Sequence, residues 1–218
     1  MTPSPEPRSH RKGLTRDLVV ERTLQMIDEV GPDGLTIRGL AQRLGVEPMS
    51  IYAHIPSKAA LLDAVVARVL AAMELPDPRL RWDQVLIDGF GAYRKALLKH
   101  PRTVPLVALR TPTGTQRLGL MEASLAALKR GGLKPERMVV AQVTLVAYVL
   151  GFVLQEAAGR ELPTQAWLAE TLRGAPADYP HVLEVAPVLA RFSVDARFDT
   201  GLRLIVSALA VGDPAEEA

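Results

Sequence analysis

Hydrophobic residues recur along this chain at intervals of three and four, which is the spacing of one face of an α-helix. The pattern predicts helices at the following positions, in chain order: 15–30, 36–44, 48–54, 57–73, 82–100, a short segment between Pro101 and Pro105, 113–131, 136–158, 164–172, 180–192 and 194–211. No stretch of useful length alternates between apolar and polar residues as a strand does. The sequence therefore predicts an all-α fold.

Residues 36–54, TIRGLAQRLGVEPMSIYAH, have the spacing of a helix-turn-helix. Ala41 is small enough for a second helix to cross the first, and Gly45 accepts the positive φ that the turn requires. Pro48 suits the first position of the second helix, and Ile51 is the branched apolar residue that faces back. The alternative is an ordinary corner between two helices with no role in DNA binding.

Polar side chains lie around the second helix of this motif. Tyr52, His54 and Lys58 fall on the side opposite Ile51, where they form a rim suited to phosphates. Met49 is placed to touch a thymine methyl group, and Arg38 to reach a guanine edge. The residues expected to contact DNA are Thr36, Arg38, Pro48, Met49, Ser50, Tyr52, His54 and Lys58.

The segment GLTIRGLAQRLGV, followed by SIYAHIPSKAALLDAV, resembles the N-terminal domain of the tetracycline-repressor (TetR) family of bacterial transcription regulators. The match covers about residues 15–73, and weaker similarity continues through 82–112 and 151–155. The resemblance implies a three-helix DNA-binding domain at 15–60 and a C-terminal helical domain for ligand binding and dimerisation at 61–218. Residues 57–73 would be the connecting helix, and residues 1–14 a disordered arm that either reaches DNA or only aids solubility.

Charge alone would not identify a DNA-binding protein. The formal net charge is +2, and residues 1–58 hold eight Lys or Arg and seven Asp or Glu. The chain has no cysteine, and its first residues lack the apolar stretch of a signal peptide, so we expect a cytoplasmic protein.

Catalytic and metal-binding patterns are missing from the sequence. Its four histidines, His10, His54, His100 and His181, have no metal-ligand spacing, and neither a Gly-x-Ser-x-Gly motif nor a phosphate-binding glycine loop occurs. We therefore expect no enzyme, no cofactor and no metal site.

Residues 138–155 contain no charged residue. A stretch of this length lies near the lower limit of a membrane span, but Gln142 and Thr144 interrupt it, and a helix that is apolar all round is otherwise a buried one. The last helix offers a partner, either within one subunit or across a dimer; the family resemblance implies a homodimer without membrane contact. The expected dimer residues are Tyr148, Gly151, Phe198, Leu202, Ile205 and Leu209.

A mostly apolar cavity with a few polar groups is typical of a small-molecule site. The residues expected to line it are Leu86, Phe90, Tyr93, Val107, Arg110, Leu120, Ser124, Gln142 and Val146. The alternative is a filled core. In tetracycline-binding members of the family, a histidine holds the drug's magnesium ion, and an Asn, a Phe and a second His contact the drug. The corresponding residues here are Val107, Gly89, Tyr93 and Glu74, so only the aromatic position is kept.

The resemblance thus implies a different effector, an apolar or aromatic molecule bound without metal, whose signal passes through the helix at 57–73. Three functions remain open at this point. The first is a ligand-responsive dimeric regulator of operator DNA, which in this family is most often a repressor. The second is a constitutive or architectural DNA-binding protein, and the third is a helical interaction protein. About 140 residues beyond the motif, with an apolar interior, favour the first.

Overall fold

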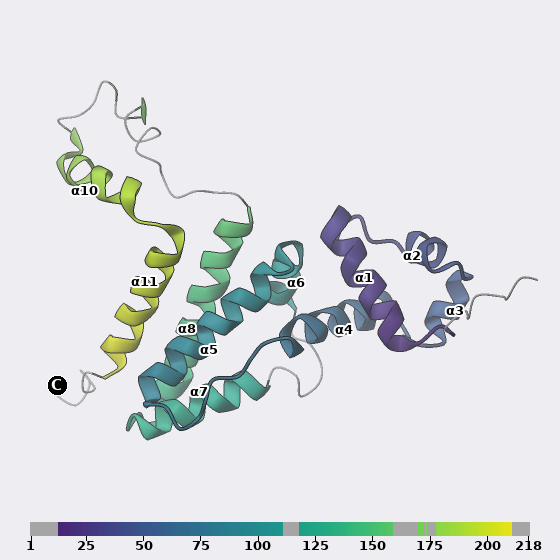
Figure 1. Cartoon of the computed structure of the whole chain (residues 1–218), viewed down its shortest axis with the longest axis horizontal. Coiled ribbons are helices and arrows are strands. Elements are labelled where there is room, and N and C mark those ends of the chain that lie inside the picture. Colours follow the sequence, from purple (N-terminus) through teal and green to yellow (C-terminus); the bar gives the residue numbers. More distant parts are fainter. Residues whose placement is uncertain (1–12, 111–117, 159–169, 172, 174–177, 211–218) are drawn as a thin grey trace, which may run out of the picture. The chain divides into compact units, whose positions relative to one another are not determined.

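The computed structural model describes residues 13–110, 118–158, 170–171, 173 and 178–210. These residues form two compact units that divide between Val65 and Val66. Every regular element in the described ranges is a helix, so the all-α prediction is confirmed (Figure 1).

The first unit contains α1, α2, α3 and the beginning of α4. Their bounds are Arg16–Val30, Ile37–Leu44, Pro48–Tyr52 and Lys58–Ala71. Hydroxyl groups at the predicted starts cap three of them: Thr15 Oγ accepts from the Leu18 amide at 3.2 Å, Thr36 Oγ from Gly39 at 3.0 Å, and Ser57 Oγ from Ala60 at 3.1 Å. Each cap satisfies an amide that has no partner within the helix.

The turn between α2 and α3 has the predicted left-handed residue. Gly45 has φ 67° and ψ 36°, and its amide bonds to the carbonyls of Ala41 and Gln42. A residue with a Cβ would be strained in this conformation. Ile51 is buried on the inner face of α3, and α2 packs on both α1 and α3. The predicted helix-turn-helix is therefore confirmed.

The second unit is a bundle around α5. The helices after α4 have the bounds α5 Trp82–Leu98, η1 Pro101–Thr103, α6 Val104–Leu109, α7 Leu118–Arg130, α8 Pro135–Ala157, α10 Pro180–Arg191 and α11 Val194–Leu209. The predicted helix over 164–172 and the predicted start of the helix at 113 lie largely outside the described residues. The other boundaries agree with the hydrophobic pattern to within two residues.

The helix α5 packs against α7, α8 and α11, and supplies the centre of the core (Figure 1). Its residues Leu86, Phe90 and Leu97 are fully buried. The helices α8 and α11 also pack against each other, so they bury apolar surface within one subunit. Packing of these helices across a dimer, the other possibility that the sequence left open, stays a prediction.

Two residues predicted to lie in the dimer interface are buried within a single subunit. Phe198 and Leu202 are buried in the core of their own subunit, so they offer no surface to a second copy. The Tyr148 hydroxyl donates to the Phe198 carbonyl at 2.9 Å and lies over Gly201, where a Cβ would collide with it. Helical periodicity gave Phe198 and Leu202 an apolar face, but it did not show which neighbour covers that face.

The helix α8 is long and apolar enough to cross a membrane by length and composition, with a mean hydropathy of 2.0. One such helix is weak grounds for a membrane span, because the core helices of soluble proteins pass the same test. Here its inner face packs on α5, α7 and α11. Its outer face is apolar and exposed: Val139, Val140 and Val143 are each 60–64% accessible.

Candidate DNA interface and effector site

The helix α3 presents its polar and flexible side chains on the surface of the first unit. Ile51 anchors the helix inward, while Met49 is 74% exposed, and Tyr52 is also exposed. Ser50 and Pro48 are half-buried in the first turn. An exposed methionine has no role in the core, so Met49 is available for an apolar contact with a partner surface.

The start of α2 is also exposed and can bind an anion. Thr36 caps the helix by accepting a hydrogen bond, which leaves its hydroxyl proton free to donate. Arg38 lies exposed in the same first turn. The amides and the partial positive charge of a helix N-terminus attract phosphate, and the guanidinium strengthens that attraction.

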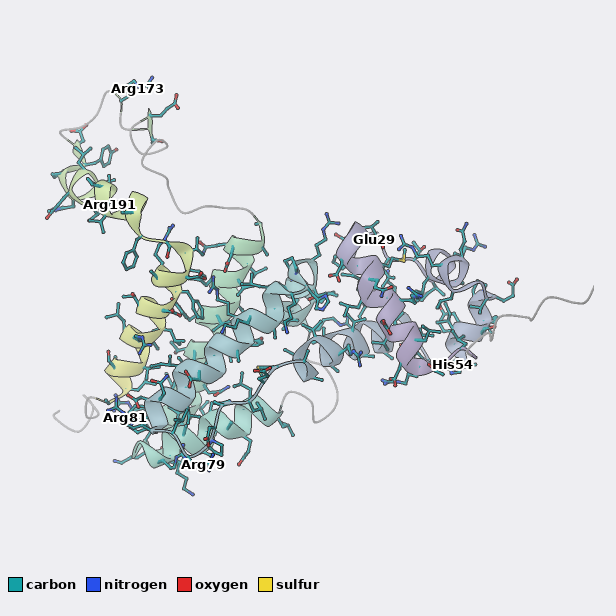
Figure 2. The ribbon with its side chains drawn as sticks, viewed as in Figure 1. Glu29, His54, Arg79, Arg81, Arg173 and Arg191 are labelled. Carbon is teal, nitrogen blue, oxygen red and sulfur yellow. The ribbon has the colours of Figure 1, made fainter. Side chains whose placement is uncertain are left out.

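Lys58 is held at the start of α4. Its ammonium donates to the Leu35 carbonyl at 2.7 Å, which uses one of its three protons and fixes its position. His54, between α3 and α4, is exposed on the surface of the first unit (Figure 2). All eight residues predicted to contact DNA thus belong to the starts of α2 and α4, to α3 and to the turn after it.

A nearby cation has a different role. Arg43 forms an ion pair with Glu29 at 2.5 Å, which connects α2 to α1. Both side chains are substantially exposed, so the pair contributes little stability. It does reduce the number of cations that the surface of this unit offers to phosphate.

The predicted effector residues lie in the interior of the second unit. Leu86, Phe90 and Tyr93 on α5, Val107 on α6 and Leu120 on α7 are all buried. Arg110 and Val146 are half-buried. The helices that carry most of these residues pack against one another, as a common site requires.

A polar pair lies within this apolar region. Ser124 of α7 and Gln142 of α8 are both buried, and the Ser124 Oγ to Gln142 Oε1 distance is 2.5 Å. Ser124 Oγ is also 2.9 Å from the Met121 carbonyl oxygen. Ser124 and Gln142 are the buried polar side chains of α7 and α8 in the described part of the chain, and they partner each other.

Gly89 allows α5 to approach its neighbours closely. A Cβ at this position would lie 3.1 Å from Leu120 Cδ1 and 3.3 Å from Pro76 Cγ. Leu120 and Pro76 therefore occupy the space that a polar side chain at position 89 would need. No group of three or more metal-ligating side chains occurs among the residues that the structure describes.

The hydrophobic pattern does not predict the charged cluster of Arg94, Glu156 and Asp195. Arg94 is 8% exposed; it donates to both oxygens of Glu156, and its Nη1 lies 2.7 Å from Asp195 Oδ1. Its guanidinium carbon lies 4.8 Å from the centre of the Phe198 ring. Burial lowers the pKa of Arg94, but the two carboxylates more than offset it and leave the pKa raised. A charged residue directly after Tyr93 on the inner face of α5 was the available signal.

Two family models match the chain. The model described as "Bacterial regulatory proteins, tetR family" matches residues 19–65, which lie within the first unit. The model described as "Tetracyclin repressor-like, C-terminal domain" matches residues 75–211, more than half of the chain.

Curated relatives and solved structures agree with the two family models. An HTH-type transcriptional regulator of Saccharopolyspora erythraea is 31% identical, covering 94% of this chain and 89% of the relative. The class A tetracycline repressor from transposon 1721, of Escherichia coli, is 32% identical, covering 90% and 91%. The TetR family protein ActR of Streptomyces coelicolor, in complex with (S)-DNPA, has a TM-score of 0.79 at 30% identity, covering 90% of this chain and 96% of ActR; ActR has also been solved with actinorhodin.

These matches span both units and most of each relative's length, and they fit a surface helix-turn-helix joined to a helical domain with a partly polar interior. The proteins that match are regulators of transcription rather than enzymes. The chain belongs to the TetR family of bacterial transcription regulators.

Proposed function

We propose that this chain is a cytoplasmic repressor that binds a palindromic operator as a homodimer and leaves it when a small apolar or aromatic molecule binds inside the second unit. The main support for DNA binding is the exposed face of α3, on which Met49 is 74% exposed. The buried Ser124–Gln142 pair in an apolar interior supports the effector half.

On DNA, α3 enters the major groove, with Met49 against a thymine methyl and Ser50 within reach of a base or phosphate. Arg38 reads a guanine edge from the first turn of α2. Thr36, Tyr52, His54 and Lys58 hold phosphates and set the register of the helix on the duplex. The contact of Lys58 with the Leu35 carbonyl supports its role, because it restrains a long side chain that would otherwise lose entropy on binding.

The dimer surface is the outer face of α8 with the neighbouring face of α11. Val139, Val140 and Val143 of α8 are exposed together, and Leu204 of α11 is 66% exposed. Contiguous apolar surface of this kind typically marks a protein interface. Ile205 and Leu209 are half-buried and lie at the edge of this face, together with Tyr148 and Gly151 on α8. A two-fold dimer matches the symmetry of a palindromic operator.

The effector binds without a metal ion, because Val107 provides no ligand atom for a cation and Leu120 with Pro76 closes the space at Gly89. The relative ActR, crystallised with (S)-DNPA and with actinorhodin, supports a small organic molecule for this fold. The helix α4 belongs to both units, since it runs across the division between Val65 and Val66. A shift of the second half of α4 therefore changes the separation of the two recognition helices of the dimer and disfavours the DNA-bound state.

The test has two steps. Selection of bound duplexes from a random pool should yield an inverted repeat with half-sites about one helical turn apart or a multiple of it. A library of small molecules is then screened for release of that operator. Recovery of an operator that no compound releases would favour the alternative of a constitutive or architectural DNA-binding protein. Failure to enrich any duplex would contradict both.

A further inference from the structure

Met49 is the most exposed methionine in the described part of the chain. It is 74% exposed, whereas Met121 is 44% and Met26 only 6% exposed. Met73 and Met138 are half-buried. The chain has no cysteine, so all of its sulfur atoms belong to methionines. The thioether that an oxidant in solution meets most readily, among the described residues, therefore lies on α3.

The packing of α3 explains why this sulfur is accessible. Ile51 is buried on the inner face of the helix, and Met49 lies exposed on the outer face. In the proposed function, on which this inference rests, the outer face enters the major groove and Met49 packs against a thymine methyl. The same sulfur is thus open to solvent in the free protein and covered on the operator.

Oxidation by a peroxide changes this side chain from apolar to polar. A lone pair of the sulfur attacks one oxygen of hydrogen peroxide, so that an S–O bond forms and the O–O bond breaks. The sulfur is oxidised to a sulfoxide, and the peroxide is reduced and leaves as one water molecule. Sulfoxide reductases reverse the change, so it is suited to a switch.

We propose that Met49 is a peroxide-sensitive modification site that controls operator binding. The sulfoxide oxygen is a hydrogen-bond acceptor, and a thymine methyl offers it no donor. Burying this oxygen in the groove without a partner weakens binding, and we expect operator affinity to fall at least about 10-fold. Bound DNA covers the sulfur, so the peroxide reacts with free protein and keeps it from rebinding.

The test begins with the full-length protein and increasing amounts of hydrogen peroxide. Peptide mass spectrometry measures the sulfoxide at each methionine, and fluorescence anisotropy measures affinity for the selected operator. Met49 should be oxidised before Met121, and the loss of affinity should follow the fraction of Met49 that is oxidised. Treatment with methionine sulfoxide reductases should restore binding.

Two variants assign the effect to this residue. Met49→Leu keeps an apolar side chain but has no sulfur, so its operator affinity, whatever its starting value, should change by less than about twofold on peroxide treatment. Met121→Leu removes the next most exposed described methionine, on α7, and should remain as sensitive as the wild-type protein. A further measurement needs no variant: operator DNA should slow the oxidation of Met49 and leave that of Met121 unchanged.

Three outcomes would overturn the inference. They are oxidation of Met121 before Met49, unchanged affinity of protein whose Met49 is oxidised, and an equal loss of affinity when Met49→Leu is treated. Each of them leaves the proposed function standing. If the untreated protein enriches no duplex, the proposed function is contradicted and the inference falls with it.

Discussion

Arg94 and Glu156 form a two-point ion pair, with Nε to Oε2 at 3.0 Å and Nη2 to Oε1 at 2.7 Å. The pair joins α5, the helix at the centre of the second unit, to the last turn of α8. The same guanidinium contacts Asp195 in the first turn of α11, so one side chain connects three helices. Two parallel hydrogen bonds fix the plane of the guanidinium as well as its distance.

The variant Arg94→Met should destabilise the second unit by about 2–3 kcal/mol. Removing one partner of a buried pair leaves the other without compensation, but Glu156 is 23% exposed and Asp195 is 79% exposed, which lets water replace part of the loss. Chemical denaturation measures the free energy of unfolding. Lys95→Met, on the exposed side of α5, is the control and should change it little. Equal stabilities of the two variants would contradict a structural role for Arg94.

An exposed ion pair at the start of α5 gives a pH prediction. A hydrogen bond from Arg81 keeps the pKa of Asp83 below its ordinary value of 3.8. A lowered pKa in the folded state adds stability above the unfolded pKa, and this contribution is lost as the pH falls through the folded pKa. NMR titration should therefore show Asp83 more than half ionised at pH 3.8, and Arg81→Ala should raise its pKa. Arg203→Ala, elsewhere on the surface, should leave the Asp83 titration unchanged.

Local features of the chain were readable from the sequence because neighbouring residues determine them. Thr15, Thr36 and Ser57 cap helices through amides three residues away, and Gly45 provides the left-handed turn. These are short-range effects, so they need no knowledge of the rest of the fold.

Contacts between distant residues could not be read in the same way. Arg94 and Glu156 are 62 residues apart, and nothing in the pattern of either helix pairs them. The apolar face of α11 was visible as a stripe, but only the packing of α5 and α8 shows that it covers Phe198 and leaves Leu204 exposed. Helical period identifies a face, while its partner depends on the whole topology.

The variant Val143→Glu should separate the proposed dimer. Val143 is 63% exposed in the single chain, so a charge there is tolerated in a monomer but would be buried twice in a two-fold interface. We expect dimer affinity to fall by more than about 100-fold, as measured by sedimentation equilibrium. Leu80→Glu, at an exposed position before α5, is the control. A wild-type protein that sediments as a monomer at micromolar concentration would contradict the prediction directly.

Tetracycline with magnesium should not bind, and Gly89→Asn should not create binding. The new Cβ would press on Leu120 and Pro76, so we expect the variant to lose about 1–3 kcal/mol of stability. Calorimetry with tetracycline and magnesium tests the binding, and thermal unfolding tests the stability. Gly91→Asn is the matched control, because a Cβ at Gly91 meets nothing within 4 Å. Magnesium-dependent binding at micromolar concentration that also releases the operator would refute the proposal of a metal-free effector.

Met49 should read thymine through its methyl group. Its side chain is the most exposed apolar group on α3 and has no hydrogen-bonding atom suited to a base edge, so its contribution must come from apolar contact. In the selected operator, replacing each thymine by deoxyuridine removes only that methyl group. At one position per half-site, this replacement should cost the wild-type protein about 1 kcal/mol of binding free energy. Met49→Ala should bind the thymine and deoxyuridine duplexes equally. Lys58→Ala, which removes a proposed phosphate contact, should weaken all duplexes alike and reduce the salt dependence of binding. Sensitivity to deoxyuridine that persists unchanged in Met49→Ala would assign the reading of thymine to another residue.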